Sequence, residues 1–112
     1  MDILPDKDIH TVSQLYGKYK NIKETSVRIY KDTFLRYYLL KGRCRSGRSD
    51  VYSILCVKCK GGETVGCEFA FDISSRPDDA AHIYGVLCRN AVTPDCLFEA
   101  LDNILYDTLM MR

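Results

Sequence analysis

The feature that most constrains the fold is the pair of glycines Gly61 and Gly62, which separates two runs of strand-forming residues. Residues 51–59 and 64–73 are rich in β-branched and aromatic side chains, and a Gly-Gly centre permits the positive φ angles of a two-residue turn. We therefore predict an antiparallel hairpin. Counting outward from its bend gives a register that pairs Lys60 with Glu63, Lys58 with Val65, Cys56 with Cys67, Ile54 with Phe69 and Tyr52 with Phe71.

In this register one face of the hairpin is apolar. Cys56 and Cys67 lie on that face and are predicted core residues. The face consists of Tyr52, Ile54, Cys56, Val65, Cys67, Phe69 and Phe71. Cys56 and Cys59 have the Cys-x-x-Cys spacing of zinc sites, but residues three apart on a strand point to opposite faces. We therefore expect no metal site, no cofactor and buried, reduced thiols. A disulfide between Cys56 and Cys67 remains the alternative.

The chain before the hairpin predicts two more strands and a helix. Residues 25–40 are dominated by aromatic and β-branched side chains, with a turn at residues 31–33, and the Gly- and Ser-containing segment 41–49 is a predicted loop. Residues 5–20 are expected to form a helix that opens at Pro5. Its apolar stripe would be Ile9, Val12, Leu15, Tyr16 and Tyr19.

Two helices are predicted after the hairpin. Ser75 is the expected cap of the first, which opens at Pro77 and buries Ala80, Ile83, Tyr84, Leu87 and Cys88. Thr93 is the expected cap of the second, in which Leu97, Phe98, Leu101, Ile104, Leu105 and Leu109 recur at helical spacing. The order α-β-β-β-β-α-α predicts one α+β domain over residues 1–112, a four-stranded antiparallel sheet with the helices packed on one face.

Charge is separated along the chain. Residues 1–50 carry eleven basic and six acidic side chains, a net charge of +5, and residues 51–112 carry five and nine, a net charge of −4. Such a distribution indicates either two faces with different partners or head-to-tail self-association.

The sequence favours a protein without catalytic activity. It has two histidines and lacks the nucleophile-elbow, phosphate-loop and zinc-protease motifs, so we expect no enzyme. The first 25 residues contain no apolar signal core, and no apolar run approaches the roughly 20 residues of a membrane span. We expect a soluble intracellular protein, without membrane association, in the cytoplasm or nucleus of a cell.

Two segments are candidate binding sites. Lys41, Arg43, Arg45 and Arg48 follow Tyr37 and Tyr38, an arrangement that allows phosphate contacts and base stacking by residues 36–48, unless the tyrosines belong to the core. The last helix is the second candidate. Its apolar stripe continues into residues that would contact a protein partner, Leu101, Leu105, Tyr106 and Met110, unless it is an ordinary core helix.

Residues 91–109, AVTPDCLFEALDNILYDTL, resemble the last long helix of the geminivirus replication enhancer proteins, best over residues 100–107. The preceding order of aromatic strands, basic turn, hairpin and short helix is also similar to that family. The resemblance implies a small non-enzymatic viral accessory protein that self-associates and binds the viral replication initiator and host replication factors in the plant nucleus, raising viral DNA levels. By residue match, the resemblance implies that Leu101, Leu105 and Tyr106 are the partner-binding positions of this helix.

These observations together predict a non-enzymatic interaction protein, of viral or host-regulatory kind, that oligomerises and binds replication or host regulatory proteins. Apolar contacts through the last helix would hold the partner, and the basic loop would steer it electrostatically. The alternative is a nucleic-acid-binding protein, such as a suppressor of host RNA-based defence, that uses residues 36–48.

Overall fold

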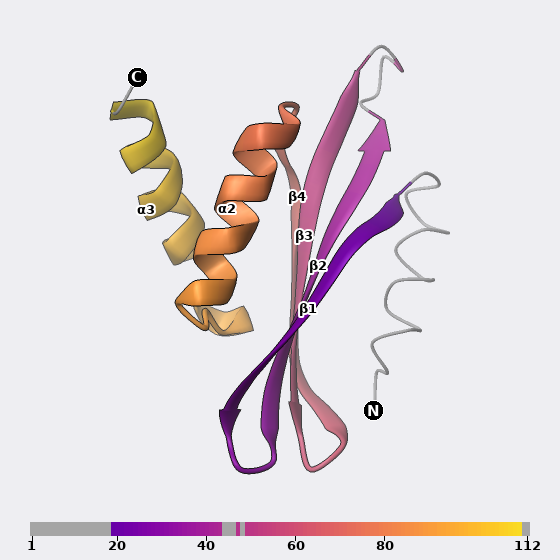
Figure 1. The fold of residues 1–112 in the computed structure, drawn as a ribbon, viewed down its shortest axis with the longest axis vertical. Coiled ribbons are helices and arrows are strands. Elements are labelled where there is room, and N and C mark those ends of the chain that lie inside the picture. The colour runs from indigo at the N-terminus through magenta and orange to yellow at the C-terminus, as the bar shows by residue number, and fades with distance from the viewer. Residues whose placement is uncertain (1–18, 44–46, 48, 111–112) are drawn as a thin grey trace.

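The computed structural model describes residues 19–43, 47 and 49–110, which form one antiparallel sheet with helices on one side (Figure 1). The sheet order is β1-β2-β3-β4. The elements are β1 (Lys20–Tyr30), β2 (Thr33–Arg43), β3 (Asp50–Lys60), β4 (Glu63–Ser74), α2 (Pro77–Arg89), the 3₁₀ turn η1 (Pro94–Cys96) and α3 (Leu97–Met110). The predicted α+β architecture, with its four-stranded sheet and two C-terminal helices, is confirmed.

The boundaries of the first elements differ from the prediction. The helix expected over residues 5–20 lies outside the described residues up to residue 18, and Lys20 already belongs to β1. β1 therefore begins five residues before the strand that the sequence predicts. All residues of its first half, from Lys20 to Glu24, are exposed, and most are charged or polar, so the β-branched and aromatic signal is weak there.

The helices cover one face of the sheet, which we call the helix face. Tyr37, Ile54 and Cys56 from the two central strands are fully buried there. Ile83 and Leu87 of α2 pack on them, together with the first turns of α3. In Figure 1, α2 stands next to the strands and α3 stands outside it. The apolar spacing thus predicts the buried side of α2 and the buried positions Leu97 and Leu101 of α3.

The second face of the sheet also carries a buried cluster, which the sequence analysis did not assign. Its core is Tyr38, Leu40, Leu55 and Val57, and Tyr19, Cys59 and Phe69 pack against it. The central strands β2 and β3 are therefore buried on both faces. This explains why residues 37–40 and 54–57 are continuous apolar runs without polar alternation.

The predicted register of the β3–β4 hairpin holds through the pair Cys59 and Thr64 and is wrong beyond it. Gly61 and Gly62 form the bend, with φ values of 59° and 85°, and Lys60 pairs with Glu63 as predicted. A bulge then inserts Val65, which has no partner on β3, so the residues of β4 from Gly66 to Ala70 are displaced by one position. A second irregularity, between Ile54 and Tyr52 on β3, displaces Ser74 by three positions. The observed pairs beyond the bulge are Lys58 with Gly66, Val57 with Cys67, Cys56 with Glu68, Leu55 with Phe69, Ile54 with Ala70 and Tyr52 with Ser74.

The displacement moves several predicted core residues off the helix face. Cys67 lies opposite Val57 on the second face, and Phe69 joins the second cluster. Val65 and Phe71 are exposed. A shift of one residue exchanges the two faces of a strand, and a bulge produces this shift without any change in the turn.

A second irregularity in β4 is held by a buried serine. Asp72 has a φ of 49°, and its N–H donates to Ser53 Oγ at 2.8 Å. The Asp72 carboxylate accepts from the Tyr19 hydroxyl, also at 2.8 Å. Ser53 has no solvent exposure, so Asp72 supplies the partner that a buried hydroxyl requires.

The cap of α2 differs from the prediction, whereas Thr93 occupies the N-cap position predicted for it. α2 has Arg76 rather than Ser75 at its N-cap, without a side-chain cap bond, and the Ser74 hydroxyl accepts from the Arg76 N–H. Thr93 precedes the 3₁₀ turn η1, also without a side-chain cap bond, and α3 proper begins at Leu97. Proline at the first position of both elements agrees with the prediction.

Candidate functional site

The loop between α2 and η1 positions the candidate site. α2 ends in a Schellman motif, in which the Ala91 N–H donates to the Cys88 carbonyl and the Val92 N–H donates to the Leu87 carbonyl, both at 3.2 Å. Ala91 takes the left-handed conformation of this motif, with a φ of 48°. The chain therefore turns sharply at residues 90–92 and leads into η1 and α3.

The helix face of the sheet holds this loop in place. The Tyr37 hydroxyl donates to the Val92 carbonyl oxygen at 2.6 Å, and the Cys56 thiol lies 3.5 Å from the same oxygen. Tyr84 of α2 donates to the Tyr37 carbonyl at 2.9 Å, and the two rings meet edge to face. One tyrosine in the middle of β2 thus connects the sheet to α2 and to the loop.

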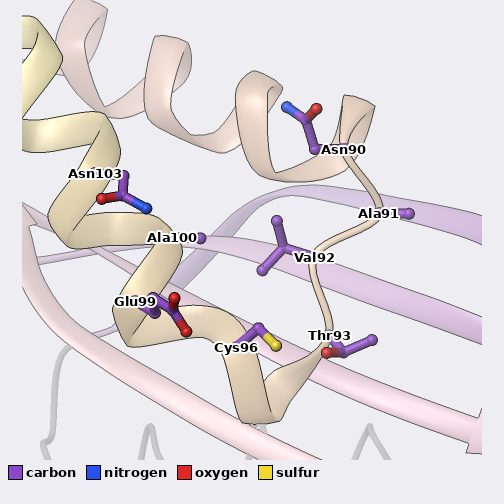
Figure 2. Close-up of a pocket in the computed structure, with 8 residues that line it drawn as sticks. All are labelled: Asn90, Ala91, Val92, Thr93, Cys96, Glu99, Ala100 and Asn103. Carbon is purple, nitrogen blue, oxygen red and sulfur yellow. The ribbon is translucent and has the colours of Figure 1, made fainter.

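The loop and α3 enclose a groove of about 360 Å³ (Figure 2). Val92 faces Ala100 across it and gives it an apolar floor, and Glu99 and Asn103 line it from α3. The Glu99 carboxylate is the single ionised group that lines it. Its full lining is Asn90, Ala91, Val92, Thr93, Cys96, Glu99, Ala100 and Asn103. We call it the loop–α3 groove.

The residues predicted to bind a partner occupy different positions on α3. Leu101 is buried in the core between the helices and the helix face of the sheet, and Leu105 packs against that core. Tyr106 is 64% exposed. Met110 belongs to α3, but its side chain lies outside the described residues. Leu101 therefore stabilises the fold, and Tyr106 is the predicted residue whose ring faces solvent.

Phe98 is an exposed aromatic residue that the sequence analysis assigned to the buried stripe. It is 52% exposed, because Leu97 and Leu101 already occupy the side of α3 that faces the core. The sequence contains a signal for this arrangement, since Leu97, Leu101 and Ile104 follow the i, i+4, i+7 spacing of one helix face and Phe98 lies to one side of it.

The outer side of α3 is acidic. Glu99, Asp102 and Asp107 are all exposed, and the helix contains no lysine or arginine. Glu99, Asn103 and Tyr106 lie on one side of α3 at i, i+4 and i+7, so the side of the helix that lines the groove carries the Tyr106 ring one turn beyond it. An acidic face with an exposed ring is suited to contact a cationic, partly apolar surface.

The basic segment proposed to contact phosphates is only partly engaged in the fold. Lys41 forms an ion pair with Asp50 at 3.3 Å, and Arg43 donates to the Gly47 carbonyl at 3.1 Å. Arg45 and Arg48 lie outside the described residues. Tyr37 and Tyr38 have no solvent exposure. The two tyrosines are core residues and do not form a stacking platform for bases.

The cysteines lie on different surfaces. Cys56 is buried on the helix face, whereas Cys59 and Cys67 belong to the second face, so the predicted apposition of Cys56 and Cys67 is wrong. No disulfide joins any two of the described cysteines. No three His, Cys, Asp or Glu side chains gather as metal ligands within the described ranges. Burial raises the pKa of the Cys56 thiol to about 12.

Comparison with known proteins gives no match to this chain among protein-family models, curated proteins or solved structures. Neither α2 nor α3 combines the length and apolar character that a membrane crossing requires.

Replacing Ala91 by glycine is expected to stabilise the protein. A non-glycine residue in the left-handed region costs about 1 kcal/mol, and part of this gain is offset because glycine has more conformational freedom in the unfolded chain. We expect the free energy of unfolding in urea to rise by about 0.5 kcal/mol. Ala81→Gly, at an exposed position inside α2, is the matched control and should destabilise the protein by about 1 kcal/mol. A decrease in stability for Ala91→Gly would contradict the assigned loop conformation.

Stability is expected to fall at alkaline pH. The thiol of Cys56 and the hydroxyls of Tyr37 and Tyr84 all have pKa values raised by burial, so the folded protein holds these protons more tightly than the unfolded chain. The contribution of Cys56 is complete below pH 9, the ordinary thiol value, and is lost as pH rises toward 12. Urea unfolding at pH 8, 9, 10 and 11 measures it. The decrease should be shallower in Cys56→Ala, and an equal slope in both proteins would contradict the burial of this thiol.

Proposed function

We propose that this protein is a non-enzymatic interaction protein that self-associates and binds protein partners through the outer side of α3. The observation that carries the proposal is the exposure of two large rings, Tyr106 at 64% and Phe98 at 52%, on a helix whose other side is buried. Aromatic side chains are enriched among the residues that dominate protein–protein binding energy.

The position of α3 in the fold supports the same proposal. The helix contacts α2, η1 and β4 through its first turns, around Leu97 and Leu101. In Figure 1 its later turns stand on the far side of α2 from the strands. The core therefore uses one side of α3, and the side that bears Tyr106 faces outward with its acidic neighbours.

The resemblance of residues 91–109 to the replication enhancers extends the proposal to a class of partner. We assign the protein to viral accessory proteins, with replication or host regulatory proteins as partners in the cytoplasm or nucleus of the host cell. Residues 41–48 provide electrostatic steering in this mechanism. Nucleic-acid binding by residues 36–48 is the competing proposal, and the burial of Tyr37 and Tyr38 removes its stacking component.

The test compares Tyr106→Ala with Leu101→Ala by sedimentation velocity and by urea unfolding. Tyr106→Ala should weaken self-association about tenfold and change stability by no more than about 0.5 kcal/mol, because the ring is exposed. Leu101→Ala should lose about 2–5 kcal/mol of stability, because it leaves a cavity in the core.

A wild-type protein that stays monomeric at high concentration would contradict the self-association. Equal association of wild type and Tyr106→Ala would contradict the role of α3. Oligonucleotide binding that depends on Lys41 and Arg43 would favour the competing function.

A further inference from the structure

We propose that the loop–α3 groove receives lysine side chains from β1 of a second copy of this chain, so that copies associate head to tail. The inference rests on the proposed self-association through α3 and adds its polarity and its contacting residues. It follows from the placement of two oppositely charged surfaces on different sides of the fold.

The acidic surface consists of the groove and the exposed side of α3. From Pro77 to Met110 the chain carries six acidic side chains and one basic side chain, Arg89. Glu99 lines the groove and Asp102 lies on the exposed side of the same helix turn. Within the described part of the chain, the ion pairs are Lys41–Asp50 and Arg76–Asp79, so neither carboxylate has a cationic partner among the described residues of its own copy.

The groove matches the shape and chemistry of a lysine side chain. Val92 and Ala100 offer an apolar floor to its methylene stem, and Glu99 offers a carboxylate to its ammonium group. The carbonyl end of α2 adds partial negative charge at the loop, since residues 90–92 follow its last turn. Tyr106 lies further along the same face, where its ring attracts a second cation.

The basic surface is the first half of β1, at the opposite edge of the sheet. Lys20 and Lys23 are exposed there, and Lys20 lies beside Lys41 of β2. From Lys20 to Arg43 the chain carries seven basic and two acidic side chains. β1 occupies one edge of the sheet in the order β1-β2-β3-β4, whereas α3 contacts β4 at the other edge.

The separation of these surfaces favours contact between copies. The lining of the groove includes no residue of β1, so the two surfaces do not form one site within a copy, but each complements the other surface of a neighbouring copy. Within its own copy, the Lys23 ammonium lies 5.6 Å from the centroid of the Tyr84 ring of α2 and the side chain stays exposed. Such a contact joins two different surfaces, so repetition produces a chain of copies unless the rotation closes a ring. It leaves Phe98, which does not line the groove, available to another protein partner.

The test is a charge exchange between two variants. Variant A carries Glu99→Lys and Asp102→Lys, and variant B carries Lys20→Glu and Lys23→Glu. Each variant alone places like charges at the contact, whereas a mixture of A and B restores opposite charges in both orientations. The matched control, Asp32→Lys with Glu63→Lys, changes the charge equally at the two hairpin turns. Circular dichroism verifies that every variant is folded.

Sedimentation velocity of each protein and of the equimolar mixture gives the result. We expect wild type and control to associate at low salt and to dissociate as salt rises from about 50 to 500 mM. Variants A and B alone should be monomeric, and their mixture should recover the mass of the wild type. A mixture that stays monomeric while wild type associates overturns the head-to-tail contact. The association of Tyr106→Ala then decides separately whether the proposed function holds. A wild type that never associates overturns both.

Discussion

The hydrogen bond from the Tyr37 hydroxyl to the Val92 carbonyl fixes the loop from which the outer half of the molecule extends. Its donor lies in the middle of the sheet, and its acceptor lies two residues before η1. The Tyr37 side chain has no solvent exposure, so its hydroxyl finds no equivalent partner if the loop moves, and a buried unpaired group costs about 1–3 kcal/mol. The direction of α3, the groove beside it and the exposure of Tyr106 all follow from where this loop is held.

The sequence predicts the elements of the fold more accurately than their pairing. Apolar spacing identifies the strands and both C-terminal helices, and Gly61 and Gly62 identify the hairpin bend. The register fails because the bulge at Val65 is a local irregularity without a composition signal, and one inserted residue moves Cys67 and Phe69 to the other face. The second buried face was detectable, because residues 37–40 contain no polar alternation.

The candidate site also combines features that the sequence predicts with features that only the structure reveals. Tyr106 and the apolar character of α3 are legible from the sequence, whereas the separation of buried Leu101 from exposed Phe98 depends on how the loop orients the helix. The groove could not be predicted, since it arises between a Schellman motif and a helix that begins five residues after that motif ends at Val92. The charge asymmetry is evident in the sequence, but the sequence does not place the two charged segments in space. In the structure β1 is one edge of the sheet, and α3 contacts β4 at the other edge.

The central claim is that the Tyr37 hydroxyl holds the loop and thereby orients α3. Hydrogen–deuterium exchange of wild type and Tyr37→Phe tests it most directly, because the substitution removes one oxygen and keeps the ring in the core. We predict about tenfold faster exchange at the amides of Val92 and of α3, with the amides of β2 and β3 unchanged. Unchanged protection throughout α3, or an equal loss over the whole sheet, would contradict the claim.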